Sequence, residues 1–138
     1  MKSFPNQIPI FPLSGVIYFP KTNLPLNIFE KRYLDLVNDS IRKDKLIGMI
    51  QQKRKDESLY KVGCLGKISD FQKSEDGRIL INLSGITRFE ILEEKENSKL
   101  YREFKVNYEK FSSDLKPTLE EINTKSIVKK AEIFFNRS

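Results

Sequence analysis

The sequence contains no histidine, and Cys64 is its single cysteine among 138 residues. Without histidine there is no Ser-His or Cys-His pair, no imidazole base that titrates near neutral pH, and no histidine-ligated metal. One cysteine permits no disulfide within the chain and suits a reducing compartment. The composition therefore predicts no catalytic, cofactor-binding or metal-binding residues. Cys64 lies in an alternating apolar stretch, and we expect it to be an inert buried side chain.

Long apolar runs and phosphate-binding loops are absent as well. No run of about 18 apolar residues could span a membrane, and the N-terminal stretch has no uninterrupted apolar region of the kind that a signal peptide needs. No G-x-x-x-x-G-K-[ST] motif occurs. We therefore expect a cytoplasmic protein without a P-loop. A Ser-Lys dyad or a carboxylate pair is the enzymatic alternative, less favoured because abundant lysine usually forms a solvated surface.

Charge of one sign is not concentrated in this chain. Lys and Arg number 25 against 19 Asp and Glu, which gives a net charge of +6. Basic and acidic residues are interleaved, as on an ordinary soluble surface. The densest basic site is residues 53–55. Nucleic acid is thus an unlikely partner, and an RNA-binding module that uses the loop near Arg54 is kept as the alternative function.

A change of period near Ile28 marks the most constrained part of the chain. Prolines at positions 9, 12, 20 and 25 interrupt short apolar runs, which predicts edge or crossing strands at residues 8–13 and before Pro20. From Ile28 onward apolar residues recur every three or four positions, which predicts a helix with one buried face. The predicted buried positions are Phe29, Tyr33, Leu36, Val37 and Ile41.

Period-two alternation predicts strands in the rest of the chain. They are expected at residues 46–50, 60–74, 79–91 and 104–108, with a loop at 51–59 and a charged turn at 93–99. Asp76-Gly77 favours a tight hairpin turn, and Gly85 predicts a kink in a long half-buried strand.

The last part of the chain predicts a linker followed by a helix. Residues 111–116 are expected to be the linker, and Thr118 with Glu121 has the spacing of a capping box. The helix carries an apolar stripe that needs a partner, and we expect it to dock on its own domain or to form a two-fold homodimer. Its apolar positions are Leu119, Ile122, Ile127, Ala131, Phe134 and Phe135.

Several segments of the chain resemble the LON domain, and they come in the order in which that family has them. The LON domain is the N-terminal domain of ATP-dependent Lon proteases (protease La), and it also occurs in stand-alone bacterial proteins. They cover about three quarters of the chain. The segments are IPIFPL (8–13), Phe19-Pro20, LPL (24–26) leading into IFEKRY (28–33), YKVGCLGKI (60–68), DGR (76–78) and GITRFEI (85–91).

The resemblance implies a mainly β fold with α (α+β): a PUA-like LON β-barrel of six strands with one inserted helix, plus a C-terminal helix that starts a truncated helical subdomain. Residues 1–111 are then the barrel domain and residues 112–138 the linker and helix. It also implies a non-catalytic recognition module that binds unfolded or degron-bearing polypeptide, with a separate ATPase or protease as a further partner.

Two sets of residues are candidates for a site. Residues 16–19 are apolar on both strand faces, as are Leu24 and Leu26, which predicts a peptide-binding patch. Its expected members are Tyr18, Phe19, Leu24 and Phe71.

The second set comprises the charged and aromatic positions of the family motifs. Phe29 and Tyr33 are expected in the core, with a peptide groove as the alternative. Glu30, Arg32 and Arg88 are expected to be structural, with Glu30 pairing with an arginine to join the helix to the long strand.

Overall fold

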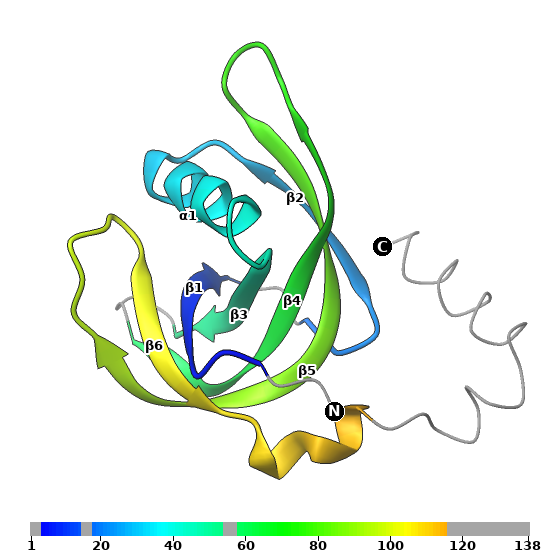
Figure 1. The fold of residues 1–138 in the computed structure, drawn as a ribbon, viewed down its shortest axis with the longest axis vertical. Coiled ribbons are helices and arrows are strands. Elements are labelled where there is room, and N and C mark those ends of the chain that lie inside the picture. The colour runs from blue at the N-terminus through cyan, green and yellow to red at the C-terminus, as the bar shows by residue number, and fades with distance from the viewer. Residues whose placement is uncertain (1–3, 15–17, 54–57, 116–138) are drawn as a thin grey trace, which may run out of the picture.

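The structure is a computed structural model that describes residues 4–14, 18–53 and 58–115. These residues are mainly β with one α-helix among them, which confirms the predicted class (Figure 1). The elements are β1 (Gln7–Leu13), β2 (Asn23–Ile28), α1 (Lys31–Ile41), β3 (Leu46–Gln52), β4 (Leu59–Lys73), β5 (Ile79–Lys95), β6 (Arg102–Asn107) and the 3-10 helix η1 (Glu109–Leu115).

Five of the six strands close into a ring, in the order β1, β3, β4, β5, β6 and back to β1. The strand β2 stands outside this ring, and among the described strands it pairs with β5 alone. The predicted barrel of six strands is therefore a closed ring of five. The hairpin half of β4 and β5, together with β2, projects beyond the ring as a three-stranded flap (Figure 1).

Proline placement follows the pairing of β1. The Val106 N–H donates to the Asn6 carbonyl. From this residue on, the backbone N–H and C=O groups of every second residue of β1 point toward β6, and Pro12 is one of these residues. β6 begins at Arg102, opposite Ile10, and pairing stops there. Pro12 therefore lies where no ladder donor is required, which is where a proline is tolerated in a sheet.

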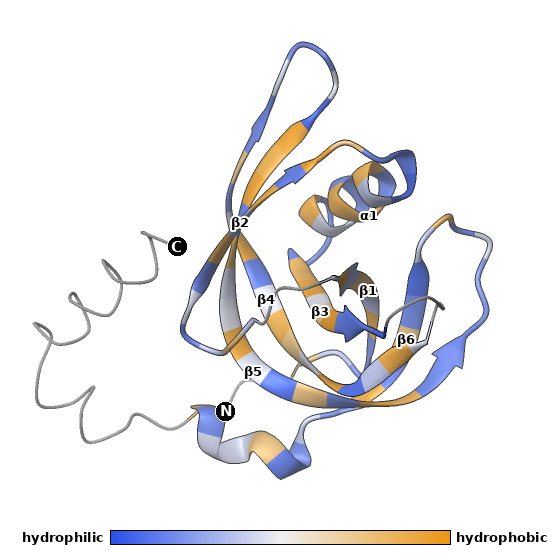
Figure 2. Cartoon of the chain, turned by 180° about the vertical axis from the view of Figure 1, so that it is seen from behind, coloured by the Kyte–Doolittle hydropathy of each residue, from blue (hydrophilic) through white to orange (hydrophobic). Residues whose placement is uncertain are grey.

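Two apolar cores stabilise the fold. One fills the closed ring, and the other lies between the outer face of β1 and β3, helix α1 and the flap, where Figure 2 shows hydrophobic residues on α1 and on the strands beside it. The buried members of the ring core are Ile8, Ile10, Ile50, Leu65, Phe89, Phe104 and Val106. Those of the flap core are Leu13, Ile28, Leu36, Val37, Ile47, Met49, Ile68, Ile79, Ile81, Leu83 and Tyr101.

Strands β4 and β5 change cores at a pair of glycines. Gly66 pairs with Gly85, next to a bulge in the register, and this confirms the kink predicted at Gly85. A Cβ on Gly66 would lie 2.8 Å from the Tyr18 hydroxyl, and a Cβ on Gly85 would overlap the Phe19 carbonyl. The segment that leads into β2 thus crosses the sheet directly on these two glycines.

The loops are shorter than the sequence predicts. β3 extends to Gln52, β4 starts at Leu59, and β5 continues to Lys95. Of these strand ends, Gln52 and Lys95 carry polar side chains and are only partly buried. Polarity alone therefore overestimated the loops at residues 51–59 and 93–99.

Residues 109–115, part of which the sequence predicts as a linker, form η1 against β5. Asp114 holds η1 in place, because Arg88 Nε and Nη2 donate to its two carboxylate oxygens at 3.0 Å each and the Arg88 backbone N–H donates at 3.0 Å. The Arg88 guanidinium also lies 4.8 Å from the centre of the Phe111 ring. The helix predicted from Thr118, with its proposed dimer, lies outside the described residues.

We expect Gly85→Ala to lower the free energy of unfolding by about 3 kcal/mol, since the new methyl group would overlap the Phe19 carbonyl. Gly77→Ala is the matched control. Gly77 has φ +92°, and its Cβ would meet nothing within 4 Å, so only the left-handed backbone penalty of about 1 kcal/mol applies. Urea denaturation measures both. Equal losses would contradict the close crossing at Gly85.

We expect Asp114→Asn to lower the free energy of unfolding at pH 7 by about 1.5 kcal/mol. The hydrogen bonds from Arg88 hold the pKa of Asp114 below its usual value. A lowered folded-state pKa gives stability that is present above the unfolded pKa of about 3.9 and is lost as the pH falls through the folded value. The difference between wild type and variant should therefore vanish at strongly acidic pH.

Chemical denaturation across this pH range tests the proposal for Asp114. Asp70→Asn is the control, because Asp70 is exposed and has no partner among the described residues. It should change stability little at any pH. A difference for Asp114→Asn that is the same at pH 7 and in acid would contradict a role for the ionised carboxylate.

Candidate functional site

The predicted patch of four residues divides into two partly buried and two exposed members. Tyr18 and Leu24 are partly buried and pack against the flap core. Phe19 is 51% exposed and Phe71 is 38% exposed. Phe19 crosses β5 at Gly85 while Phe71 pairs with Ile81, so the two positions lie roughly 13 Å apart along β5. They do not form one compact surface with Tyr18 and Leu24.

The Tyr18 hydroxyl is covered by the flap core. Burial raises its pKa well above the ordinary tyrosine value, and its oxygen has no hydrogen-bond partner among the described residues. The side chain therefore packs over Gly66 against the flap core, and its role in peptide binding stays a prediction.

The prediction that Phe29 lies in the core is wrong. Its side chain is 65% exposed, because α1 begins only at Lys31, with Glu30 as N-cap. Along β2 the residues Leu24, Leu26 and Ile28 face inward, so the next residue faces outward. Leu36 and Val37 are fully buried as predicted, and Tyr33 and Ile41 are partly buried.

Phe29 lines a groove at the start of α1, which we call the aromatic groove. It consists of two adjoining cavities of about 340 and 290 Å³ that share Pro12, Arg32, Tyr33 and Gln52. Its remaining lining includes Phe11 and Phe29 at one end and Leu100 and Arg102 at the other.

Aromatic contacts shape the floor of the groove. The rings of Phe11 and Tyr33 have centroids 4.4 Å apart, and the Arg32 guanidinium lies 4.7 Å from the centre of the Tyr33 ring. Phe11 and Tyr33 thereby form a fixed surface, while Phe29 and Leu100 are largely exposed. Such a surface of rigid aromatic side chains can bury an apolar group at a small entropic cost.

The charged residues at the groove are paired with one another. Arg32 Nε lies 3.2 Å from Glu30 Oε2, and Arg102 Nη2 lies 2.7 Å from Glu94 Oε1. The prediction that Glu30 joins the helix to the long strand through an arginine is therefore wrong, because Glu30 pairs within the start of α1. Arg88, on the long strand, pairs with Asp114 instead.

Sequence reasoning missed Leu100 and Phe11 as site residues. Leu100 lies in the polar turn before β6, where an isolated apolar residue could have indicated a contact surface. Phe11 lies on the face of β1 opposite Ile10, and the alternation of that strand predicts this orientation. The groove that they share with Phe29 depends on the tertiary fold, and no local pattern encodes it.

Other chemistry is limited in the described residues. Cys64 is buried, as predicted, and burial raises its pKa to about 12, so it holds its proton at neutral pH. Within residues 4–14, 18–53 and 58–115 no cluster of three or more metal-ligating side chains occurs. No helix in this part of the chain is long and apolar enough to cross a membrane.

Comparison with known sequences gives one family. Residues 7–134 match the ATP-dependent protease La (LON) substrate-binding domain. A Lon protease of Anaeromyxobacter dehalogenans is 25% identical over 138 aligned residues, which cover 96% of this chain and 15% of that protein. Lon protease 2 of Myxococcus xanthus is 29% identical over 98 residues, which cover 67% of this chain and 12% of that protein. The chain thus spans a small part of these relatives.

Solved structures show the same fold. A Lon N-terminal domain protein from Xanthomonas campestris has a TM-score of 0.64 and 28% identity, and the match covers 74% of this chain and 59% of that one. The N-terminal domain of the Mycobacterium avium complex Lon protease has a TM-score of 0.61 and 13% identity, with 74% and 54% covered. With a match that extends over nearly its whole length, the chain belongs to the LON substrate-binding domain family.

Proposed function

We propose that this chain is a non-catalytic recognition module that binds unfolded or degron-bearing polypeptide in the aromatic groove. The observation that carries the proposal is the exposed ring of Phe29 beside the fixed Phe11 and Tyr33 pair. Family membership supports a substrate-binding role. In this proposal ATP hydrolysis and peptide cleavage belong to other protein regions or to a separate ATPase or protease.

An apolar side chain of an extended polypeptide would bind between Phe29 and the groove floor. Fully burying one such side chain is worth roughly 1.5–3 kcal/mol, and association costs several kcal/mol in lost freedom. One such contact offsets only part of this cost, so several contacts along the polypeptide must add together. We expect micromolar or weaker affinity, which suits a module that releases its substrate. Because the arginines at the groove are paired with carboxylates, binding should depend little on salt.

Strand addition contributes little to this mode of binding. The edge of β1 beyond Ile10 is not paired with β6, but Pro12 occupies that edge and offers no N–H. Side-chain burial therefore supplies most of the affinity. The RNA-binding alternative is not favoured by the family match, and it predicts the opposite salt dependence.

We expect Phe29→Ala to weaken binding of fluorescein-labelled, unfolded casein about tenfold and to leave the melting temperature nearly unchanged. The ring is exposed in the free protein, so its removal costs little stability but removes contact area from the groove. Fluorescence anisotropy at low and high salt measures binding, and thermal unfolding measures stability.

Phe19→Ala is the matched control, because it deletes an exposed phenyl ring away from the groove. Phe71→Ala tests the other exposed member of the patch predicted from sequence. Both should bind casein like the wild type. If Phe19→Ala or Phe71→Ala weakens binding while Phe29→Ala does not, the groove is the wrong site. Binding that falls steeply with salt would favour an electrostatic partner such as RNA.

A further inference from the structure

The two cavities of the aromatic groove lie one after the other along β1. The larger, of about 340 Å³, is lined by residues 11–14 and by Phe29, and we call it the Phe29 cavity. The smaller, of about 290 Å³, is lined by Ile10, Pro12 and Leu100, among others, and we call it the Leu100 cavity. A ligand that fills both cavities must therefore extend along this strand.

The spacing of the cavities matches that of side chains on an extended polypeptide. Together they border the backbone from Ile10 to Ser14, which spans roughly 13 Å at about 3.3 Å a residue. Their centres are thus about 6–7 Å apart along β1. In an extended chain, every second side chain points to the same side, and such neighbours are also about 6–7 Å apart. One strand-like segment can therefore place alternate side chains in the two cavities.

The edge of β1 beside the cavities has room for such a segment. Pairing with β6 begins at Arg102, opposite Ile10, and beyond Ile10 none of the described strands pairs with this edge. The Pro12 carbonyl group points to the same edge and can accept one backbone hydrogen bond. That single bond favours a segment aligned with β1, while the affinity comes from the two side chains.

Each cavity has room for one large apolar side chain. An apolar cavity of about 150 Å³ is enough to hold benzene, and both cavities exceed that volume. The Phe29 cavity offers the exposed Phe29 ring together with Phe11 and Tyr33. The Leu100 cavity offers Leu100, which is 59% exposed, together with Tyr101. Apolar contact surface is thus available in both.

Hydrogen bonds hold the turn that carries Leu100. Asn97 Nδ2 donates to Glu103 Oε1 at 2.8 Å and to the Tyr101 carbonyl at 3.3 Å. Lys99 Nζ donates to the same Glu103 oxygen at 3.3 Å, and the Lys99 backbone N–H donates to Asn97 Oδ1 at 3.0 Å. Although its side chain is exposed, Leu100 therefore stands on a fixed backbone.

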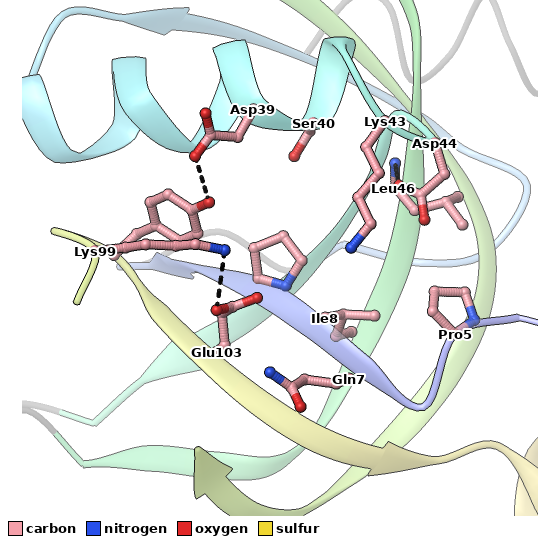
Figure 3. Close-up of a pocket in the computed structure, with 12 residues that line it drawn as sticks. Pro5, Gln7, Ile8, Asp39, Ser40, Lys43, Asp44, Leu46, Lys99 and Glu103 are labelled. Carbon is pink, nitrogen blue, oxygen red and sulfur yellow. Dashed lines mark hydrogen bonds and ion pairs between the residues drawn. The ribbon is translucent and has the colours of Figure 1, made fainter. Parts of the chain in front are cut away.

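Tyr101 ties this turn to helix α1. Its hydroxyl donates to Asp39 at 2.6 Å, and Figure 3 shows this hydrogen bond next to the ion pair of Lys99 with Glu103. Tyr33 lies on the same helix and lines both cavities. The Leu100 cavity is therefore held in place relative to the Phe29 cavity, and both are formed before a ligand binds.

We infer that the groove holds an extended polypeptide through two large apolar side chains at positions n and n+2, one in the Phe29 cavity and one in the Leu100 cavity. This inference rests on the proposed function of the groove and adds a spacing rule to it. The side chain between the two points away from the groove, so it can be polar. Directly adjacent apolar residues point to opposite sides of an extended chain and fill only one cavity.

Fluorescein-labelled peptides of identical composition test the spacing. Each contains two phenylalanines among serines and glycines, placed one, two or three positions apart, and a peptide with a single phenylalanine gives the baseline. Fluorescence anisotropy with the full chain, at protein concentrations up to the millimolar range, measures affinity. We expect the peptide with spacing two to bind about tenfold more tightly than the other three, since it alone buries a side chain in each cavity.

Leu100→Ala tests the second cavity. It should weaken binding of the spacing-two peptide about tenfold and leave the single-phenylalanine peptide nearly unchanged, because that peptide can use the Phe29 cavity. Leu92→Ala is the matched control, since Leu92 is 51% exposed and lines neither cavity. It should bind all peptides like the wild type. Thermal unfolding should show that both variants are folded.

Three results would overturn the spacing rule: no binding of the spacing-two peptide, affinities that do not depend on spacing, or equal binding of that peptide by wild type and Leu100→Ala. If casein binding is still lost in Phe29→Ala, any of these results rejects the rule and keeps the groove as the binding site. A casein affinity that Phe29→Ala leaves unchanged rejects the proposed function of the groove, and the spacing rule with it.

Discussion

The fold depends on the close contact between two paired glycines and the segment that crosses them. Because Gly66 and Gly85 have no side chains, the backbone near Phe19 lies directly on β4 and β5. Lys21 and Thr22 then exchange hydrogen bonds with Gly85 at 2.9 and 2.8 Å, which starts β2 in register on the flap. A bulkier residue at either glycine would lift the segment and shift that register.

The position of the aromatic groove follows from that register. β2 alternates inward and outward residues until Ile28, which is buried in the flap core. Phe29 therefore faces outward, and α1 starts two residues later against the same core. The helix brings Tyr33 to within 4.4 Å of the Phe11 ring on β1. A surface made from three elements is thus fixed by one backbone crossing and by the burial of Leu36 and Val37.

Much of the fold could be predicted because its signals are local. The alternation of residues 79–91, the hairpin turn at Asp76-Gly77, whose Gly77 has φ +92°, and the burial of Cys64 all follow from neighbouring residues. Phe29 could not be placed by the same reasoning, because a helical period and a strand period overlap at residue 29. The helical pattern was extended back to Ile28, ahead of the observed start of α1, and this placed Phe29 in the core. The alternation of β2 instead gives Phe29 the outward orientation that the structure shows.

The partners of the charged residues were unpredictable for a different reason. Arg88 has a carboxylate partner 26 positions away, in a segment whose composition resembles a linker. No periodicity of the sequence encodes such an ion pair. Many arginines and many Asp or Glu residues could equally well have been the two partners. Tyr18 and Leu24 illustrate the related problem of apolar residues on both faces of a strand. The flap core covers them, and only the tertiary fold shows that the cover exists.

Tyr101 lines one end of the aromatic groove and joins it to helix α1. Its ring is buried in the flap core, while its hydroxyl donates to Asp39 on α1 at 2.6 Å. That hydrogen bond is the leading cause of the lowered pKa of Asp39, and it ties the end of α1 to the segment before β6. The Tyr101 side of the aromatic groove is therefore held by both α1 and the segment before β6. The groove thus depends on the packing of α1 at both of its ends, on Phe11 through Tyr33 and on Tyr101 through Asp39.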